Sequence, residues 1–248
     1  MPVQNAFVAT LFIYSILFIW CDTAEARRFT YLKEAKPYTP GELEIENWVT
    51  WKTSETVDRF DFRHELEYNF TRHMQLGFYL VDWRHTSIRD DGSQTEYLHS
   101  GVEFVWNFTD PVKDILGCSS YSEVLVGHER LVLEQKLLLQ KNFGPLVATY
   151  NLVLEAKWEE EFEETKGEIK NILGVSADAH ELISLGFEFL YEIGIPEWES
   201  FGPGLLYVGP NFRFHTKHWG FAIAPLAQLT NRRNEARWMT RLIFAIEF

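Results

Sequence analysis

The chain has 248 residues, of which 46% are hydrophobic and 16% are aromatic, and its formal net charge is −13. This length fits one large domain, and the acidic charge argues against a nucleic-acid-binding protein. The mean hydropathy is only −0.19 although aromatic residues are frequent. A low mean with many aromatic residues is expected when each strand has one apolar and one polar face.

The N-terminus has the features of an export signal. Residues 6–20 form an apolar run that is short for a membrane helix, and Ala24-x-Ala26 follows as a signal-peptidase site. We therefore predict a signal peptide over residues 1–26. An uncleaved anchor helix stays open as an alternative, because no Lys or Arg precedes Ala26. After cleavage Cys118 is the only cysteine left, which excludes an intrachain disulfide.

Residues 27–40 contain Pro37 and Pro40, and we expect this segment to be a short, irregular periplasmic lead-in. From residue 41 to residue 248, apolar and polar residues alternate with period two, which is typical of β-strands. The strands are expected near 41–52, 59–70, 74–84, 96–108, 115–126, 130–141, 146–158, 168–177, 182–192, 204–215, 219–229 and 238–248. The strand over 115–126 is ambiguous, because neither of its faces is purely apolar. Pro210 and Pro225 lie inside two strands, where they predict local bulges.

The connections between these strands alternate in length. Tight connections are expected near 72, 110, 143, 179 and 216, and mostly longer ones near 55, 90, 163, 198 and 233; a short connection near 128 breaks the rule. Short turns at one end and long loops at the other are typical of outer-membrane barrels. A soluble β-sandwich is the alternative, but its outer face would be polar.

The last strand, WMTRLIFAIEF, ends the chain with an aromatic residue on its apolar face. This strand resembles the C-terminal strand of bacterial outer-membrane β-barrel proteins. The resemblance implies a transmembrane, antiparallel, up-and-down β-barrel in the outer membrane of a Gram-negative bacterium. We expect about 12 strands, with 10 as the other possibility. The resemblance also implies that Phe244, Ile246 and Phe248 form a signal read by the barrel assembly machinery. The stretch PGELEIENWVTWK is similar to a functionally uncharacterised group of proteobacterial-type outer-membrane proteins.

Catalytic and metal-binding motifs are not found in the sequence. It contains no G-x-S-x-G, no C-x-x-C and no H-E-x-x-H. His215 and His218 are expected at a solvated turn rather than on a metal. We therefore expect no enzymatic activity, no metal and no cofactor.

Two acidic clusters are the candidate sites. With a loop over 53–58, Glu44 and Glu46 face either Glu65 and Glu67, or Arg63 and Glu65 after a two-residue shift. This lumen cluster is open to three interpretations: a structural charge network, a cation-selective constriction or a catalytic carboxylate pair. The second cluster is an outer loop that comprises Glu159, Glu160, Glu161, Glu163 and Glu164. It is open to two interpretations: a solvated acidic loop, or a loop that contacts cations at lipopolysaccharide or at a pore mouth.

These features favour a narrow channel for small polar or cationic solutes. An outer-membrane lipid-modifying enzyme and a closed structural barrel are the alternatives. The expected partners are outer-membrane lipid, lipopolysaccharide and the barrel assembly machinery, with no nucleic acid.

Overall fold

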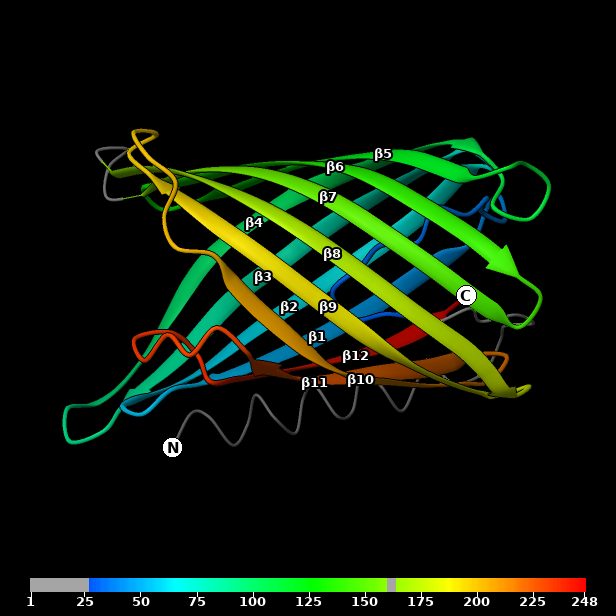
Figure 1. The fold of residues 1–248 in the computed structure, drawn as a ribbon. Helices are drawn as coiled ribbons and strands as arrows, with labels where there is room; N and C mark the ends of the chain where they lie inside the picture. Colours follow the sequence, from blue (N-terminus) through cyan, green and yellow to red (C-terminus); the bar gives the residue numbers. More distant parts are fainter. Residues whose placement is uncertain (1–26, 160–163) are drawn as a thin grey trace, which may run out of the picture.

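The computed structural model describes residues 27–159 and 164–248, and within this part of the chain twelve antiparallel strands form a closed barrel (Figure 1). Each strand pairs with its sequence neighbours, and β1 pairs with β12 to close the sheet. The strands are β1 (Leu43–Thr53), β2 (Val57–Thr71), β3 (Met74–Ile88), β4 (Gly92–Thr109), β5 (Gly117–Gly127), β6 (Arg130–Phe143), β7 (Leu146–Glu159), β8 (Glu164–His180), β9 (Ile183–Pro196), β10 (Leu205–His215), β11 (Trp219–Gln228) and β12 (Trp238–Glu247). The predicted all-β, twelve-stranded fold is confirmed.

The predicted signal peptide lies outside the described residues. Among the residues that are described, no helix has the length and apolar character needed to span a bilayer.

The period-two alternation holds through most of the wall. In β7, for example, Asn151 and Val153 are buried in the lumen and Leu154 is exposed on the outside. The ambiguous strand β5 also follows this rule, with Tyr121 buried and Val124 exposed. One predicted orientation is wrong: Leu98 lines the lumen instead of the outer face.

The cause of this error is an irregularity between β3 and β4. Their register shifts on both sides of Asp82, and beyond the shift the exposed Tyr97 pairs with Trp83. The shift changes which residues point inward, so Leu98 and His99 both line the lumen.

The barrel has an inner rim, where Phe248 lies, and an opposite outer rim (Figure 1). The connections over 197–204 and 229–237 are long and lie at the outer rim, as predicted. The connections over 54–56 and 89–91 are shorter than expected, because the flanking strands extend further. Residues 110–116 at the inner rim form a longer connection than the tight turn that was predicted.

The bulges predicted at Pro210 and Pro225 are not observed. The β10–β11 register is the same on both sides of these residues, so the two prolines face each other across the ladder. Pairing is interrupted between Val208↔Ala227 and Phe212↔Ile223 because proline has no N–H to donate. The ladder therefore loses hydrogen bonds at this point without inserting an extra residue.

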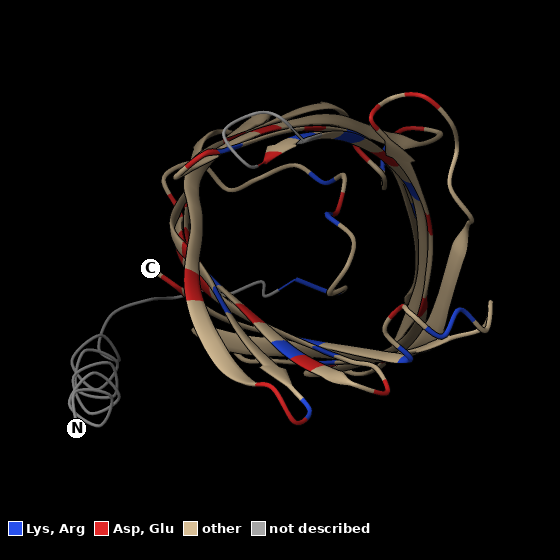
Figure 2. Ribbon diagram, turned by 90° about the vertical axis from the view of Figure 1, so that its left-hand side faces the viewer, with Lys and Arg blue, Asp and Glu red and all other residues tan. Residues whose placement is uncertain are grey.

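Residues 27–40 do not form the periplasmic lead-in that we expected. This luminal segment turns into the barrel and crosses its interior (Figure 2). The side chains of Phe29, Leu32 and Ala35 are fully buried there. The segment then returns to the inner rim, where the Tyr38 amide donates to the Arg72 carbonyl at 3.0 Å. The sequence pattern suggested a linker because nothing in the segment alternates like a strand.

Candidate functional site

A row of glutamates winds through the lumen from the inner to the outer rim. Starting at Glu247 on β12, each glutamate is the direct cross-strand partner of the next, and Gly77 takes the one intervening position on β3. We call this set the carboxylate row: Glu247, Glu44, Glu67, Glu103, Glu123, Glu134, Glu155 and Glu168. The row advances along the barrel axis from strand to strand, because barrel strands are tilted relative to that axis.

Like charges placed directly opposite each other destabilise a sheet. In the outer half of the row, basic side chains of the wall compensate the negative charges of the glutamates. Lys136 Nζ lies 2.8 Å from Glu134 Oε1. Lys170 Nζ lies 3.2 Å from Glu155 Oε2 and 3.4 Å from Glu168 Oε2. These contacts pair Glu134, Glu155 and Glu168 of the outer half with bases of the wall.

The inner half of the row includes Glu44 and Glu67 of the acidic cluster predicted for the first hairpin, and Glu46 and Glu65 lie beside them. Of the two registers considered, the structure adopts the first, with Glu44 opposite Glu67 and Glu46 opposite Glu65. Carboxylate oxygens of Glu46, Glu65 and Glu67 lie within 4.8 Å of one another. The fifth predicted member, Arg63, is directed away from these carboxylates towards Asp82, at 2.8 Å.

Gly77 makes room for this concentration of carboxylates. A Cβ atom at Gly77 would lie 2.4 Å from Glu103 Cγ and 2.8 Å from Glu65 Oε1. A glycine at this position of β3 therefore allows the two glutamates to approach the wall closely.

The luminal segment supplies the cations that the inner half of the wall lacks. Arg27 Nη2 lies 2.7 Å from Glu67 Oε1, and Arg27 Nε lies 3.0 Å from Glu46 Oε1. Lys33 Nζ lies 2.8 Å from Glu103 Oε1 and also contacts Glu67. The row is thus compensated by the wall in its outer half, and by the luminal segment at Glu67 and Glu103 in its inner half.

Polar side chains of the wall also bind the backbone of the luminal segment. The carboxylate of Glu188 accepts hydrogen bonds from the Thr30 amide at 2.7 Å and the Tyr31 amide at 2.8 Å. Asn151 accepts from the Lys33 amide at 2.8 Å and donates to its carbonyl at 3.0 Å. These bonds replace the water that an irregular backbone would otherwise need.

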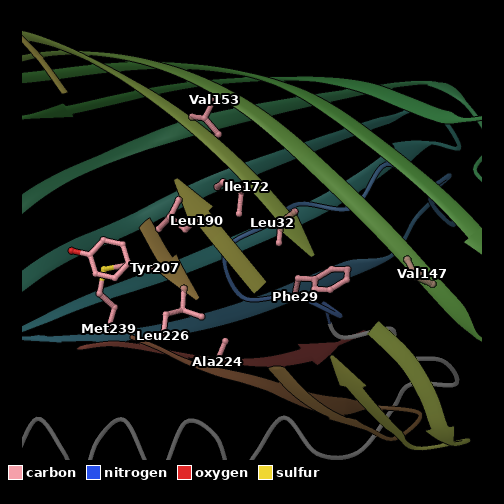
Figure 3. Close-up of a cluster of buried hydrophobic side chains, with 10 residues drawn as sticks. All are labelled: Phe29, Leu32, Val147, Val153, Ile172, Leu190, Tyr207, Ala224, Leu226 and Met239. Carbon is pink, nitrogen blue, oxygen red and sulfur yellow. The ribbon is translucent and has the colours of Figure 1, made fainter. Parts of the chain in front are cut away.

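Apolar contacts complete the attachment. Figure 3 shows Phe29 and Leu32 of the segment within a cluster of buried side chains contributed by the wall. Its wall members include Val153, Ile172 and Leu190, which face the lumen instead of the membrane. A water-filled lumen would not favour these apolar residues, so their position is explained by the segment packed against them.

The luminal segment contributes to two cavities. The outer cavity, of about 290 Å³, includes Tyr31 among its lining residues, and the inner cavity, of about 600 Å³, includes Arg27, Lys33 and Tyr38. In the outer cavity basic side chains outnumber acidic ones. The bases are Lys52, Arg59, Arg63, Arg84, Arg130, Lys136, Lys157, Lys170 and Arg241; the acids are Asp61, Asp82, Glu123, Glu134, Glu155, Glu159 and Glu192.

The remaining predicted residues lie at the edges of these cavities, at the barrel rims or outside the described residues. Glu159 pairs with Lys166 at 3.3 Å, whereas Glu160, Glu161, Glu163 and the side chain of Glu164 lie outside the described residues. His215 lines the inner cavity, and His218 is exposed. The Phe248 amide donates to the Leu43 carbonyl at 2.8 Å, so the last residue helps to join β12 to β1.

Sequence reasoning missed six members of the row: Glu247, which is aligned by the β1–β12 closure, and Glu103, Glu123, Glu134, Glu155 and Glu168 of the later hairpins. Each has a hydrophobic neighbour in its strand, which is a weak signal alone. Applying the register argument used for the first hairpin to every later hairpin would have aligned the last five of these glutamates.

Residues 22–237 match the family described as "Family of unknown function (DUF6662)". The chain belongs to this family. A search of the curated proteins found no match. This DUF6662 member is thus placed by its family and its fold, and neither assigns an activity.

Solved structures with a similar fold are outer-membrane barrels. A NanC porin is 7% identical with a TM-score of 0.55, and the match covers 82% of this chain and 98% of that chain. The translocator domain of the autotransporter NalP from Neisseria meningitidis is 10% identical with a TM-score of 0.52, and the match covers 85% and 89%. These likenesses show that this DUF6662 member has the fold of an outer-membrane β-barrel.

Proposed function

We propose that this protein is a narrow outer-membrane channel for small polar solutes, with a preference for cations. The observation that carries the proposal is the carboxylate row, which places a carboxylate on each of eight strands of the described barrel, β12, β1, β2 and β4 to β8. Rings or rows of carboxylates raise the local concentration of cations in a pore.

The preference is expected to arise in the inner half of the lumen. Wall bases offset the row in its outer half, and basic side chains outnumber acidic ones in the outer cavity. In the inner half, the wall contributes Glu46 and Glu65 beside the row, and their cationic partner Arg27 comes from the luminal segment. Cations therefore have their strongest attraction at this level.

A closed structural barrel is the second candidate, because the luminal segment packs across the interior through ion pairs and apolar contacts. The lipid-modifying enzyme is less favoured. Asp82 and His99 lie 3.1 Å apart in the lumen, but Arg63 binds the same carboxylate, which suits a structural charge network.

Conductance in planar lipid bilayers tests the proposal. In a KCl gradient, the full-length protein is expected to show a reversal potential on the cation-selective side. The combined change Glu123→Gln, Glu134→Gln and Glu155→Gln leaves Lys136 without its carboxylate partner and Lys170 with Glu168 alone. The reversal potential should then shift towards anions.

A matched control removes three acids outside the lumen, with the changes Glu129→Gln, Glu197→Gln and Glu199→Gln, all at exposed positions of the outer rim. This variant should keep the reversal potential of the unmodified protein. The channel would be contradicted if the folded protein carried no current and if a folded variant without the basic residues of the luminal segment also carried none. This result would favour the closed barrel.

A further inference from the structure

Two side chains of the luminal segment occupy a site whose chemistry suits organic cations in general. We call Glu46, Glu65, Glu67 and Glu103 the inner cation site; all four are almost completely buried. A guanidinium group from Arg27 and an ammonium group from Lys33 lie among these carboxylates. The site therefore already binds the two commonest organic cations of proteins, but both belong to its own chain.

Aromatic side chains add a second feature of cation recognition. The Arg27 guanidinium lies 4.7 Å from the centre of the Trp48 ring, and the Arg63 guanidinium lies 4.0 Å from that of Tyr79. Trp48 is also fixed to the site, because its Nε1 donates to Glu46 Oε2 at 2.8 Å. Aromatic faces attract cations, and planar guanidinium groups stack on them especially well.

The luminal segment does not supply hydrogen bonds to every carboxylate of this site. Among the described residues, neither carboxylate oxygen of the fully buried Glu65 accepts a hydrogen bond. The ion-pair contact of Glu65 with Arg27 Nη2 is long, at 3.8 Å. Buried carboxylates without hydrogen bonds are costly. A free cation, which has no backbone to hold it in place, can approach Glu65 more closely than the tethered Arg27.

We propose that the inner cation site binds small organic cations that carry a guanidinium or primary ammonium group. In the absence of such a solute, Arg27 and Lys33 of the luminal segment occupy the site as intramolecular competitors. This inference rests on the proposed channel function and specifies its solute class. N–H donors are required, because charge-assisted hydrogen bonds to carboxylates are much stronger than contacts with a cation that has no donor.

The competition sets the concentration at which a solute acts. A tethered group has an effective concentration on the order of millimolar. The solute must therefore reach a similar concentration before it displaces Arg27 and Lys33. Displacement then loosens the segment between these residues and the inner rim, because the Lys33 contacts help to hold it against the wall.

A cysteine in the luminal segment reports this displacement. Ala35 is fully buried, so a thiol at this position is protected while the segment is in place, and we would introduce Ala35→Cys into the full-length chain with Cys21→Ser and Cys118→Ser. The probe is agmatine, which has one guanidinium and one primary ammonium group. Agmatine is expected to raise the rate of labelling by a membrane-impermeant maleimide severalfold, with half of the effect at millimolar concentration. Tetramethylammonium, at the same ionic strength, should have little effect.

Two matched variants separate binding from general loosening. Asp91→Cys, at an exposed outer turn, should be labelled at a rate that agmatine does not change. Glu65→Gln in the Ala35→Cys protein should weaken the response to agmatine, since it removes the carboxylate that is poorly paired. This design does not depend on an Arg27→Gln and Lys33→Gln double variant, which leaves buried carboxylates unpaired and can fail to fold.

The outcomes distinguish the two proposals. Equal responses to agmatine and tetramethylammonium, or no response to either, would overturn the inference; a cation-selective current in bilayers would then still support the channel. A selective response to agmatine in a folded protein that carries no current would support the inner cation site and reject the channel.

Discussion

Gly174 leaves space in the barrel wall for two side chains of the luminal segment. A Cβ atom at this position would lie 2.6 Å from Phe29 Cε1 and 2.9 Å from Leu32 Cδ1. Both contacts are shorter than van der Waals distance, so a larger residue must push the segment away from the wall. At the scale of single residues, the attachment of the segment is therefore sensitive to added volume.

We predict that Gly174→Val weakens the packing of the luminal segment by about 1–3 kcal/mol, the usual cost of overfilling a packed interior. Limited proteolysis should then cleave the segment faster than in the unmodified protein. The control is Gly194→Val on β9, where a Cβ atom meets nothing within 4 Å. Equal cleavage of both variants would show that Gly174 does not limit the position of the segment.

At the scale of elements, β12 has two roles, since it presents an apolar face and closes the sheet. Phe244 packs near Trp219, with ring centroids 6.0 Å apart, and Ile246 pairs with Ile45 on β1. The Phe248 amide and carbonyl bond to Leu43 at 2.8 and 3.2 Å, which extends the β1–β12 ladder to the inner rim.

We predict that deletion of Phe248 lowers the yield of folded protein in the outer membrane, because it removes both hydrogen bonds and the terminal aromatic side chain. Phe248→Ala retains the backbone bonds and should separate the two effects. The measurement is the amount of protein that migrates as a compact band on an unheated gel. An unchanged yield for the deletion would mean that the terminal residue carries no assembly signal.

The elements could be predicted from the sequence because period-two alternation is a local property of each strand. The strands 59–70 and 146–158 show it within a dozen residues. The carboxylate row could not be seen in the same way, because it depends on the register of nine neighbouring strands at once. The luminal segment was missed for another reason: its partners Glu188, Asn151 and Gln140 lie more than a hundred residues away in sequence.

At the scale of the whole molecule, the barrel balances charge between its wall and its own N-terminal segment. The apolar outer face can meet lipid, while charged side chains of the wall such as Glu65, Glu103 and Glu188 are buried inside the barrel. A closed sheet has no free edge from which to unfold. The charges that face the interior must therefore be compensated by groups that already lie in the lumen when the sheet closes.

We predict that Lys33→Gln lowers the temperature at which the gel mobility changes from the folded to the unfolded form. Removing one partner of a buried ion pair costs about 3–5 kcal/mol, because the other charge stays buried. Lys33 is 7% exposed, and it contacts both Glu67 and Glu103. Lys113→Gln is the control, since Lys113 pairs with Asp110 at 3.3 Å but is 68% exposed, and exposed pairs contribute about 0–1 kcal/mol. Equal transition temperatures for the two variants would mean that water compensates the inner half of the carboxylate row without the luminal segment.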